Sequence, residues 1–220
     1  MAALDGKSSR IEEAFAPVKS TIENLWSSLV RKDEPIDTKR LLFTATRAGA
    51  GTTTIATCAA IGLARHLMKD VLLVETNFYS PTLANKLELP NPLGFADLLR
   101  GEVAVEEIIR PTGVPGLEVI PAGTGQAPGF QGSARVQRAL EVLAGRSEYL
   151  LLDGPPLLES AESRLLLPFV DQVIIVVRAR KTEQVELKRA VRIVESSGAE
   201  LLGTVLNQYK REAPGWLVPE

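Results

Sequence analysis

Short apolar runs alternate along this chain with longer stretches of helical periodicity, and this alternation limits the possible folds more than any other feature. Because the runs are brief and bounded by turn residues, we interpret them as strands rather than core helices. Strands that alternate with helices form a mostly parallel sheet flanked by helices on both faces, with right-handed crossovers. The predicted strands span residues 41–44, 71–75, 117–120, 149–153, 172–177 and 201–206.

Helices are predicted between these strands and before the first one. Four long helices span residues 53–68, 134–144, 159–167 and 183–197, and two short ones lie near 94–100 and 105–109. Upstream, apolar residues recur at spacings of four and three from Ile11 to Leu29, which is typical of an amphipathic helix that kinks or starts at Pro17. That helix packs either on its own domain or on a partner.

We divide the chain into an N-terminal extension (1–39), an α/β domain (40–209) and a C-terminal tail (210–220).

Composition excludes several classes of protein. With 45% hydrophobic and 24% charged residues over 220 positions, the chain can bury one sizeable core. Its 25 basic and 27 acidic residues are interspersed, so nucleic-acid binding is not expected. No signal peptide is visible, and the apolar runs are far shorter than the roughly 20 residues of a membrane span, so we expect a cytoplasmic protein. Cys58 and His66 are too few for a disulfide or a zinc site, and both are expected in the core.

A glycine-rich loop follows the first predicted strand and leads directly into a helix. Its sequence, from Thr46 to Thr54, is Thr-Arg-Ala-Gly-Ala-Gly-Thr-Thr-Thr. Such a loop turns backbone N–H groups toward a phosphate, and the helix N-terminus adds its dipole. Loops that handle ATP place a lysine after the last glycine, but this chain has Thr52 there, which supplies no charge. Arg47 could supply a displaced charge, or it could be a solvated loop residue.

Two acidic residues, Glu75 and Asp153, end buried strands of the predicted sheet. Ligands of open α/β sheets bind beyond the carboxyl ends of the strands, so both carboxylates are expected to face the phosphate loop. They could hold the water shell of a magnesium ion. The alternative for Asp153 is a carboxylate that caps a helix or a turn.

The glycine-rich loop occurs together with five other motifs in a recognisable order. They are residues 72–81, Gly-Phe-Ala-Asp-Leu-Leu-Arg-Gly at 94–101, Ile-Pro-Ala-Gly at 120–123, Leu-Asp-Gly-Pro-Pro at 152–156 and Leu-Gly-Thr-Val-Leu-Asn at 202–207. With this set, the chain resembles the bacterial tyrosine kinases of capsule and exopolysaccharide production, within the wider MinD and ParA group of P-loop ATPases. The resemblance extends from about residue 13 to residue 209.

The resemblance implies an ATP site and a membrane partner. It assigns the phosphates to Gly49, Ala50, Gly51, Thr52, Thr53 and Thr54, magnesium to Thr53 and Asp153, adenine to Asn207, and catalytic roles to Glu75 and Asp153. Such proteins act on the cytoplasmic segment of a membrane polysaccharide co-polymerase, a regulator of chain length. The implied location is therefore cytoplasmic, peripheral at the inner face of the membrane, and a homo-oligomer or a kinase-like paralogue is a further possible partner.

The chain departs from this family at several positions that serve catalysis. Thr52 replaces the loop lysine, Glu75 and Asn77 replace paired aspartates, and Tyr79 replaces an arginine. A segment that forms rings in the family falls on Glu13, Ala16 and Lys19, where one arginine is lost and the other is a lysine. Of the tyrosines that these kinases carry in their tails, Tyr209 alone remains.

Three functions follow from these departures. The first is a non-catalytic or weakly catalytic regulator or scaffold of polysaccharide synthesis and export. The second is an active tyrosine autokinase or ATPase in which Arg47 and Glu75 replace the missing groups. The third is a positioning ATPase of the MinD or ParA kind, although residues 210–220 show no basic amphipathic helix for surface binding. Their apolar segment around Trp216 packs either on the domain or on a partner.

Overall fold

The computed structural model describes residues 39–89, 93–124 and 133–209. The predicted N-terminal helix, the segment with Glu13, Ala16 and Lys19, and the tail from residue 210 lie outside the described residues. The proposed division of the chain at residues 39 and 209 therefore stays a prediction.

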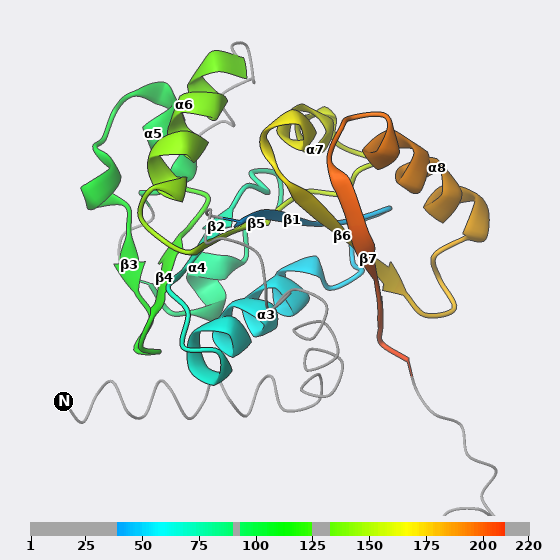
Figure 1. Cartoon of the computed structure of the whole chain (residues 1–220), viewed down its shortest axis with the longest axis horizontal. Helices are drawn as coiled ribbons and strands as arrows, with labels where there is room; N and C mark the ends of the chain where they lie inside the picture. Colours follow the sequence, from blue (N-terminus) through cyan, green and yellow to red (C-terminus); the bar gives the residue numbers. More distant parts are fainter. Residues whose placement is uncertain (1–38, 90–92, 125–132, 210–220) are drawn as a thin grey trace, which may run out of the picture.

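One seven-stranded sheet organises the described residues, in the order β3-β4-β2-β5-β1-β6-β7 (Figure 1). The strands are β1 (Lys39–Ala45), β2 (Val71–Glu75), β3 (Arg110–Pro111), β4 (Leu117–Ile120), β5 (Tyr149–Asp153), β6 (Gln172–Arg178) and β7 (Glu200–Asn207). All neighbouring strands pair in parallel except β3, which pairs antiparallel with β4. The chain leads from β1 to β2 on one side and from β6 to β7 on the other. The carboxyl ends of β1 and β6 thus meet where the direction of winding reverses, which is where open α/β sheets bind ligands.

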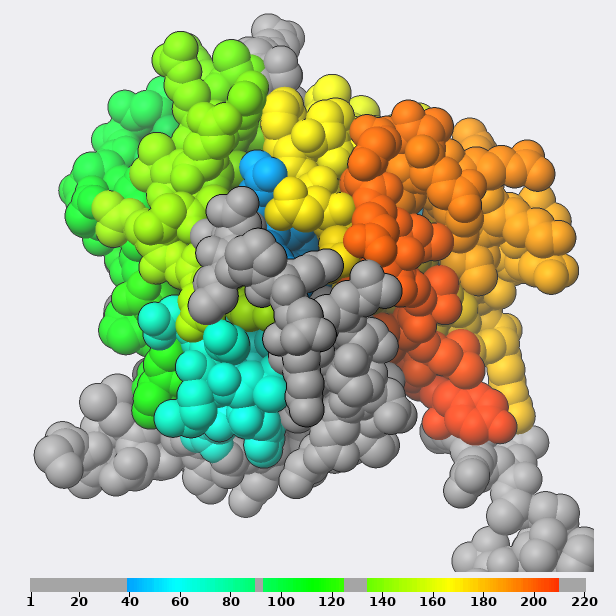
Figure 2. All heavy atoms as spheres, viewed as in Figure 1, coloured from blue at the N-terminus to red at the C-terminus, as the bar shows by residue number. Residues whose placement is uncertain are grey.

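Helices cover both faces of this sheet. The helices are α3 (Thr52–His66), α4 (Leu83–Lys86), α5 (Phe95–Arg100), α6 (Ser133–Ala144), α7 (Ala161–Leu166) and α8 (Gln184–Glu195), with 3-10 turns at Val105–Glu107 and Leu167–Phe169. In Figure 1, α3 and α4 lie on one face, and α5 to α8 lie on the other. Figure 2 shows α8 and β7, in orange and red, at the opposite end of the molecule from α5 and α6, in green.

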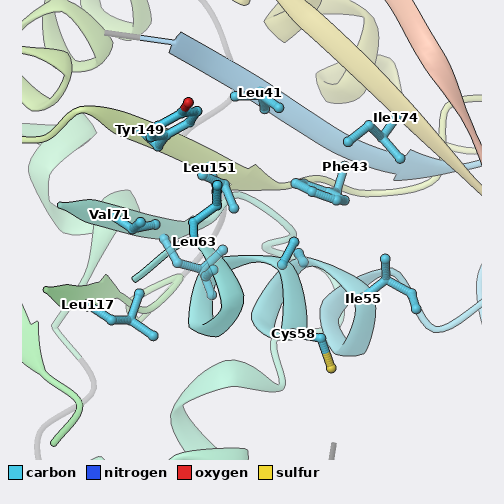
Figure 3. Packing of buried hydrophobic residues seen from close by; sticks show 14 of the residues in the cluster. Leu41, Phe43, Ile55, Cys58, Leu63, Val71, Leu117, Tyr149, Leu151 and Ile174 are labelled. Carbon is cyan, nitrogen blue, oxygen red and sulfur yellow. The ribbon is translucent and has the colours of Figure 1, made fainter. Parts of the chain in front are cut away.

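Two apolar clusters, one on each face, explain why the central strands are almost continuously apolar. Alternate residues of a strand point to opposite faces, so Leu41 and Phe43 of β1 join the cluster under α3, while Leu42 joins the other. Figure 3 shows the first cluster, in which Leu63 of α3 packs beneath Leu151 of β5. A strand that is buried on both faces needs apolar side chains at every position.

The α/β fold predicted from the sequence is confirmed, with a few local differences. All six predicted strands are present, but the two-residue edge strand β3 and the short helix α4 were not predicted. The predicted helix at 159–167 begins instead at Ala161 and passes into a 3-10 turn. Cys58 is buried as expected, whereas the prediction for His66 was wrong, because this residue is exposed at the last turn of α3. Within the described residues, no helix is long and apolar enough to cross a membrane.

Candidate functional site

The phosphate loop connects β1 to α3 and is closed by the last strand of the sheet. Gly49 and Gly51 have φ angles of 80° and 89°, which glycine adopts readily and other residues rarely do. The side-chain amide of Asn207 donates a hydrogen bond to the carbonyl of Ala50 at 2.8 Å. A Cβ atom at Gly51 would overlap this amide, so the position requires glycine for two reasons. The predicted phosphate ligands and Asn207 therefore lie at one place, at the N-terminus of α3.

Arg47 lies in this loop, but its guanidinium faces two carboxylates. Nε donates to Glu186 Oε1 at 2.5 Å and Nη1 lies 3.5 Å from Glu159 Oε1. The hydrogen bond to Glu186 and its charge raise the pKa of Arg47. Glu159 also accepts the backbone N–H of Ala48 at 2.9 Å. The side chain thus connects the loop to the segments that hold α7 and α8, and is not free to meet a phosphate.

Two other cations approach the loop from outside it. Lys86, at the end of α4, donates from Nζ to the hydroxyl of Thr54 at 3.3 Å. Arg178, at the end of β6, places Nη1 3.5 Å from where a Cβ of Gly49 would lie. Sequence reasoning singled out neither residue, because their chain positions are far from the loop and only the fold brings them to it.

Glu75 is completely buried, and its carboxylate binds backbone rather than facing solvent. Oε1 accepts the N–H groups of Thr82 at 2.5 Å and Leu83 at 2.9 Å, and Oε2 accepts that of Ala122 at 3.1 Å. Burial raises the pKa of Glu75, and these three N–H groups oppose that effect. The side chain therefore fastens the end of β2 to the start of α4 and to the segment that follows β4.

Asp153 is also buried, but its carboxylate is poorly satisfied. Among the described residues, Oδ2 has no hydrogen-bond partner. Burial raises the pKa of Asp153 to about 7, while the hydroxyl of Thr53 beside it and the more distant charge of Lys86 act in the opposite direction. An orphaned acceptor of this kind suits a cation. The described residues contain no cluster of three His, Cys, Asp or Glu side chains that could hold a metal alone. A magnesium ion would be held by Asp153 and Thr53 together with the phosphate oxygens of a ligand.

The two remaining departures from the kinase pattern lie in the loop after β2. Asn77 accepts the N–H of Ser80 at 3.3 Å and so closes a turn. Tyr79 is 67% exposed, and its hydroxyl donates to Glu162, which raises the pKa of the phenol. Neither side chain adds a positive charge to the site.

Solved structures share the α/β fold of this chain, among them kinase domains and a MinD protein. The VpsO kinase domain superposes with a TM-score of 0.77 at 22% identity, covering 93% of this chain and 98% of that one. The kinase domain of the Escherichia coli tyrosine kinase ETK has a TM-score of 0.78 at 21% identity over 87% of this chain and 76% of that one. MinD of Pyrococcus horikoshii, solved with Mg-ADP, has a TM-score of 0.69 at 18% identity over 79% and 72% of the two chains.

Relatives found by sequence similarity indicate a narrower group of proteins than the solved structures do. Those named here are bacterial tyrosine kinases. Tyrosine-protein kinase ptk of Acinetobacter johnsonii is 27% identical over 150 residues, which are 67% of this chain and only 20% of that protein. Putative tyrosine-protein kinase CapB of Staphylococcus aureus is 25% identical over 206 residues, which are 93% and 87% of the two chains. No protein-family model matches the chain. The resemblance to bacterial tyrosine kinases and MinD-like ATPases is therefore confirmed, while the effect of the substituted residues is a separate question.

Proposed function

We propose that this protein is a non-catalytic or weakly catalytic relative of the tyrosine autokinases of capsule and exopolysaccharide synthesis, acting as a regulator or scaffold. The observation that carries the proposal is the carboxylate of Glu75, which is bound by three backbone N–H groups. In the family, the acidic residue at this position is the activating base or the partner of the metal. A base must accept a proton, and this carboxylate has its acceptor sites directed at the backbone.

The phosphate loop supports the same proposal. The uncharged hydroxyl of Thr52 can donate one hydrogen bond to a phosphate, but it brings no positive charge to balance the phosphates as a lysine would. Transfer of a phosphoryl group needs positive charge most in the transition state. The substitution therefore weakens transfer more than binding. We propose that ATP or ADP, with Mg²⁺ at Thr53 and Asp153, still binds and acts as a structural signal.

The proposed partner is the cytoplasmic segment of a membrane polysaccharide co-polymerase. This proposal rests on the likeness to kinases such as CapB, and it places the protein in the cytoplasm at the inner face of the membrane. A second copy of the chain or an active kinase paralogue is an additional proposed partner. A scaffold of this kind would need its loop to respond to nucleotide without transferring phosphate.

Phosphotransfer from labelled ATP tests the proposal directly. Purified protein is incubated with ATP and Mg²⁺, with and without the partner segment, and the expected result is no label above that of a Tyr209→Phe variant. The Thr52→Lys variant serves as a second sample, and it should also remain unlabelled because Glu75 and Asn77 are unchanged. Robust labelling of Tyr209 in the natural protein would overturn the proposal.

An active kinase with a rewired site is the second candidate, and the unsatisfied carboxylate of Asp153 next to Thr53 favours it. It requires Arg47 to leave Glu159 and Glu186 and turn toward the phosphates. Loss of ATP turnover in an Arg47→Ala variant would support this candidate, and unchanged turnover would count against it.

A further inference from the structure

The phosphate loop and its surroundings lack one positive charge. Thr52 is neutral, while the buried carboxyl group of Asp153 lies beside Thr53 in the first turn of α3 and interacts with the buried carboxyl group of Glu75. One of these groups, Asp153, has a buried oxygen without a partner in the described part of the chain. A triphosphate carries more negative charge than the Mg²⁺ ion proposed at Thr53 and Asp153 balances, so a further positive charge would favour nucleotide binding.

We propose that Lys86 of α4 provides this cation and binds the outer phosphates of a nucleoside di- or triphosphate, replacing the lysine that is missing from the loop. This inference rests on one part of the proposed function, namely that the phosphate loop still binds nucleotide. It adds the residue that would bind the outer phosphates.

Contacts of the ammonium group place it at the loop. Lys86 Nζ lies 3.3 Å from the hydroxyl of Thr54, which is two residues beyond Thr52 in the first turn of α3. Its charge also lowers the pKa of both Asp153 and Glu75. The residue is nevertheless exposed, and among the described residues it forms no ion pair within 4.0 Å. The ammonium is therefore free to meet a ligand.

The buried carboxylate of Glu75 fixes the position of Lys86. It binds the N–H groups of Thr82 and Leu83, which begin α4, and the side chain of Leu83 is fully buried beneath the helix. The N–H of Lys86 then bonds to the carbonyl of Thr82 at 2.9 Å, one turn later. The carboxylate of Glu75 thus holds α4, the helix that carries the ammonium group of Lys86.

Other cations near the loop are placed differently. Arg47 is paired with Glu159 and Glu186. Arg178 lies against Gly49, which is in the loop and five residues before Thr54. Lys86 is therefore the described cation that combines a contact with the first turn of α3 and a charge near Asp153.

Nucleotide binding, measured by calorimetry with ADP and ATP in the presence of Mg²⁺, tests the inference without depending on turnover. We expect Lys86→Met to weaken binding about tenfold, since one charge-assisted contact is lost, and Lys86→Arg to retain most of the affinity. Lys188→Met, which removes the same charge from an exposed position on α8, is the matched control and should bind like the natural protein. The thermal midpoint of each variant shows that it is folded.

A double variant makes the test specific. In a Thr52→Lys background, the loop has its own ammonium, so Lys86→Met should cost far less than in the natural protein. Equal losses in the two backgrounds, an unchanged affinity in Lys86→Met, or no binding by the natural protein would each overturn the inference. No binding by the natural protein would also overturn the proposed nucleotide signal, whereas equal losses or an unchanged affinity would overturn this inference alone. The proposed lack of catalysis is tested separately, by labelling of Tyr209.

Discussion

The side-chain amide of Asn207 lies 2.8 Å from the carbonyl oxygen of Ala50, so the end of β7 holds the phosphate loop in place. Strand β7 is at the edge of the sheet and is next to β6 alone, whereas the loop follows the central strand β1. The contact therefore joins an edge of the sheet to the candidate phosphate loop. The proposed role of Asn207 in reading adenine stays a prediction, and it would have to coexist with this bond.

Replacement of Gly51 by alanine should lower the free energy of unfolding by more than a positive φ angle alone would cause. A side chain at φ 89° is strained, and its Cβ would also overlap the amide of Asn207. We expect Gly51→Ala to lower the free energy of unfolding by about 2–3 kcal/mol in urea denaturation. Gly101, with φ 78° and no atom within 4 Å of its Cβ position, is the matched control, and Gly101→Ala should cost only about 1 kcal/mol. Equal losses of stability in Gly51→Ala and Gly101→Ala would show that the overlap with Asn207 adds nothing to the cost of the Gly51 substitution.

Removal of the Glu75 carboxylate should destabilise the fold itself. Glu75→Ala leaves three N–H groups without an acceptor, those of Thr82, Leu83 and Ala122, and we expect a loss on the order of 2–4 kcal/mol. Glu75→Gln retains one acceptor oxygen and should lose less. The control is Glu195→Ala on the exposed end of α8, which should unfold at the same denaturant concentration as the natural protein. A fully stable Glu75→Ala variant would contradict the structural role.

Asp153 should make stability depend on pH. Its pKa in the folded protein is about 7, above the ordinary value of 3.8, so the folded state binds this proton more tightly than the unfolded state does. The contribution of this group is therefore fully present below about pH 4 and is lost as pH rises to about 7. As pH rises through that window, the natural protein should lose this contribution and Asp153→Asn should not. The free energy of unfolding of Asp153→Asn should therefore rise relative to that of the natural protein by on the order of 2–4 kcal/mol. Parallel pH curves for the two proteins would refute this expectation.

The sequence determines the sheet more clearly than the site. Apolar runs such as Tyr149–Asp153 could be interpreted as strands because they are short and bounded by turn residues, and burial on both faces explains their nearly continuous apolar sequence. Helix α4 was missed because it has four residues in a proline-rich stretch, and its start is fixed by hydrogen bonds to Glu75 rather than by local preference. Edge strand β3 has two residues, one of which is Pro111, so it has no periodicity to detect.

Within the site, the sequence identified groups that follow strands but could not give the direction of long side chains. Asp153 and Thr53 come together as expected, because the carboxyl ends of β5 and β1 are adjacent. The pairing of Arg47 with Glu186 joins residues 139 positions apart, and no local pattern encodes it. The same holds for Lys86 and Thr54, which are 32 positions apart and meet because Glu75 holds the start of α4.

Asp97 offers a test of whether a motif shared with the kinases is structural rather than catalytic. Its carboxylate is 1% exposed, accepts the N–H groups of Gly94 at 2.7 Å and Thr124 at 3.3 Å, and pairs with Arg100. Because the amide of Asn would direct N–H groups at donors and remove the charge, we expect Asp97→Asn to lower the free energy of unfolding by about 2–3 kcal/mol in urea. Glu102→Gln, at the 56% exposed partner that lies 2.8 Å from Arg100, is the control and should leave stability unchanged. The nucleotide affinity of Asp97→Asn, measured where the variant is folded, should equal that of the natural protein, and a specific loss of affinity would instead place this motif in the binding site.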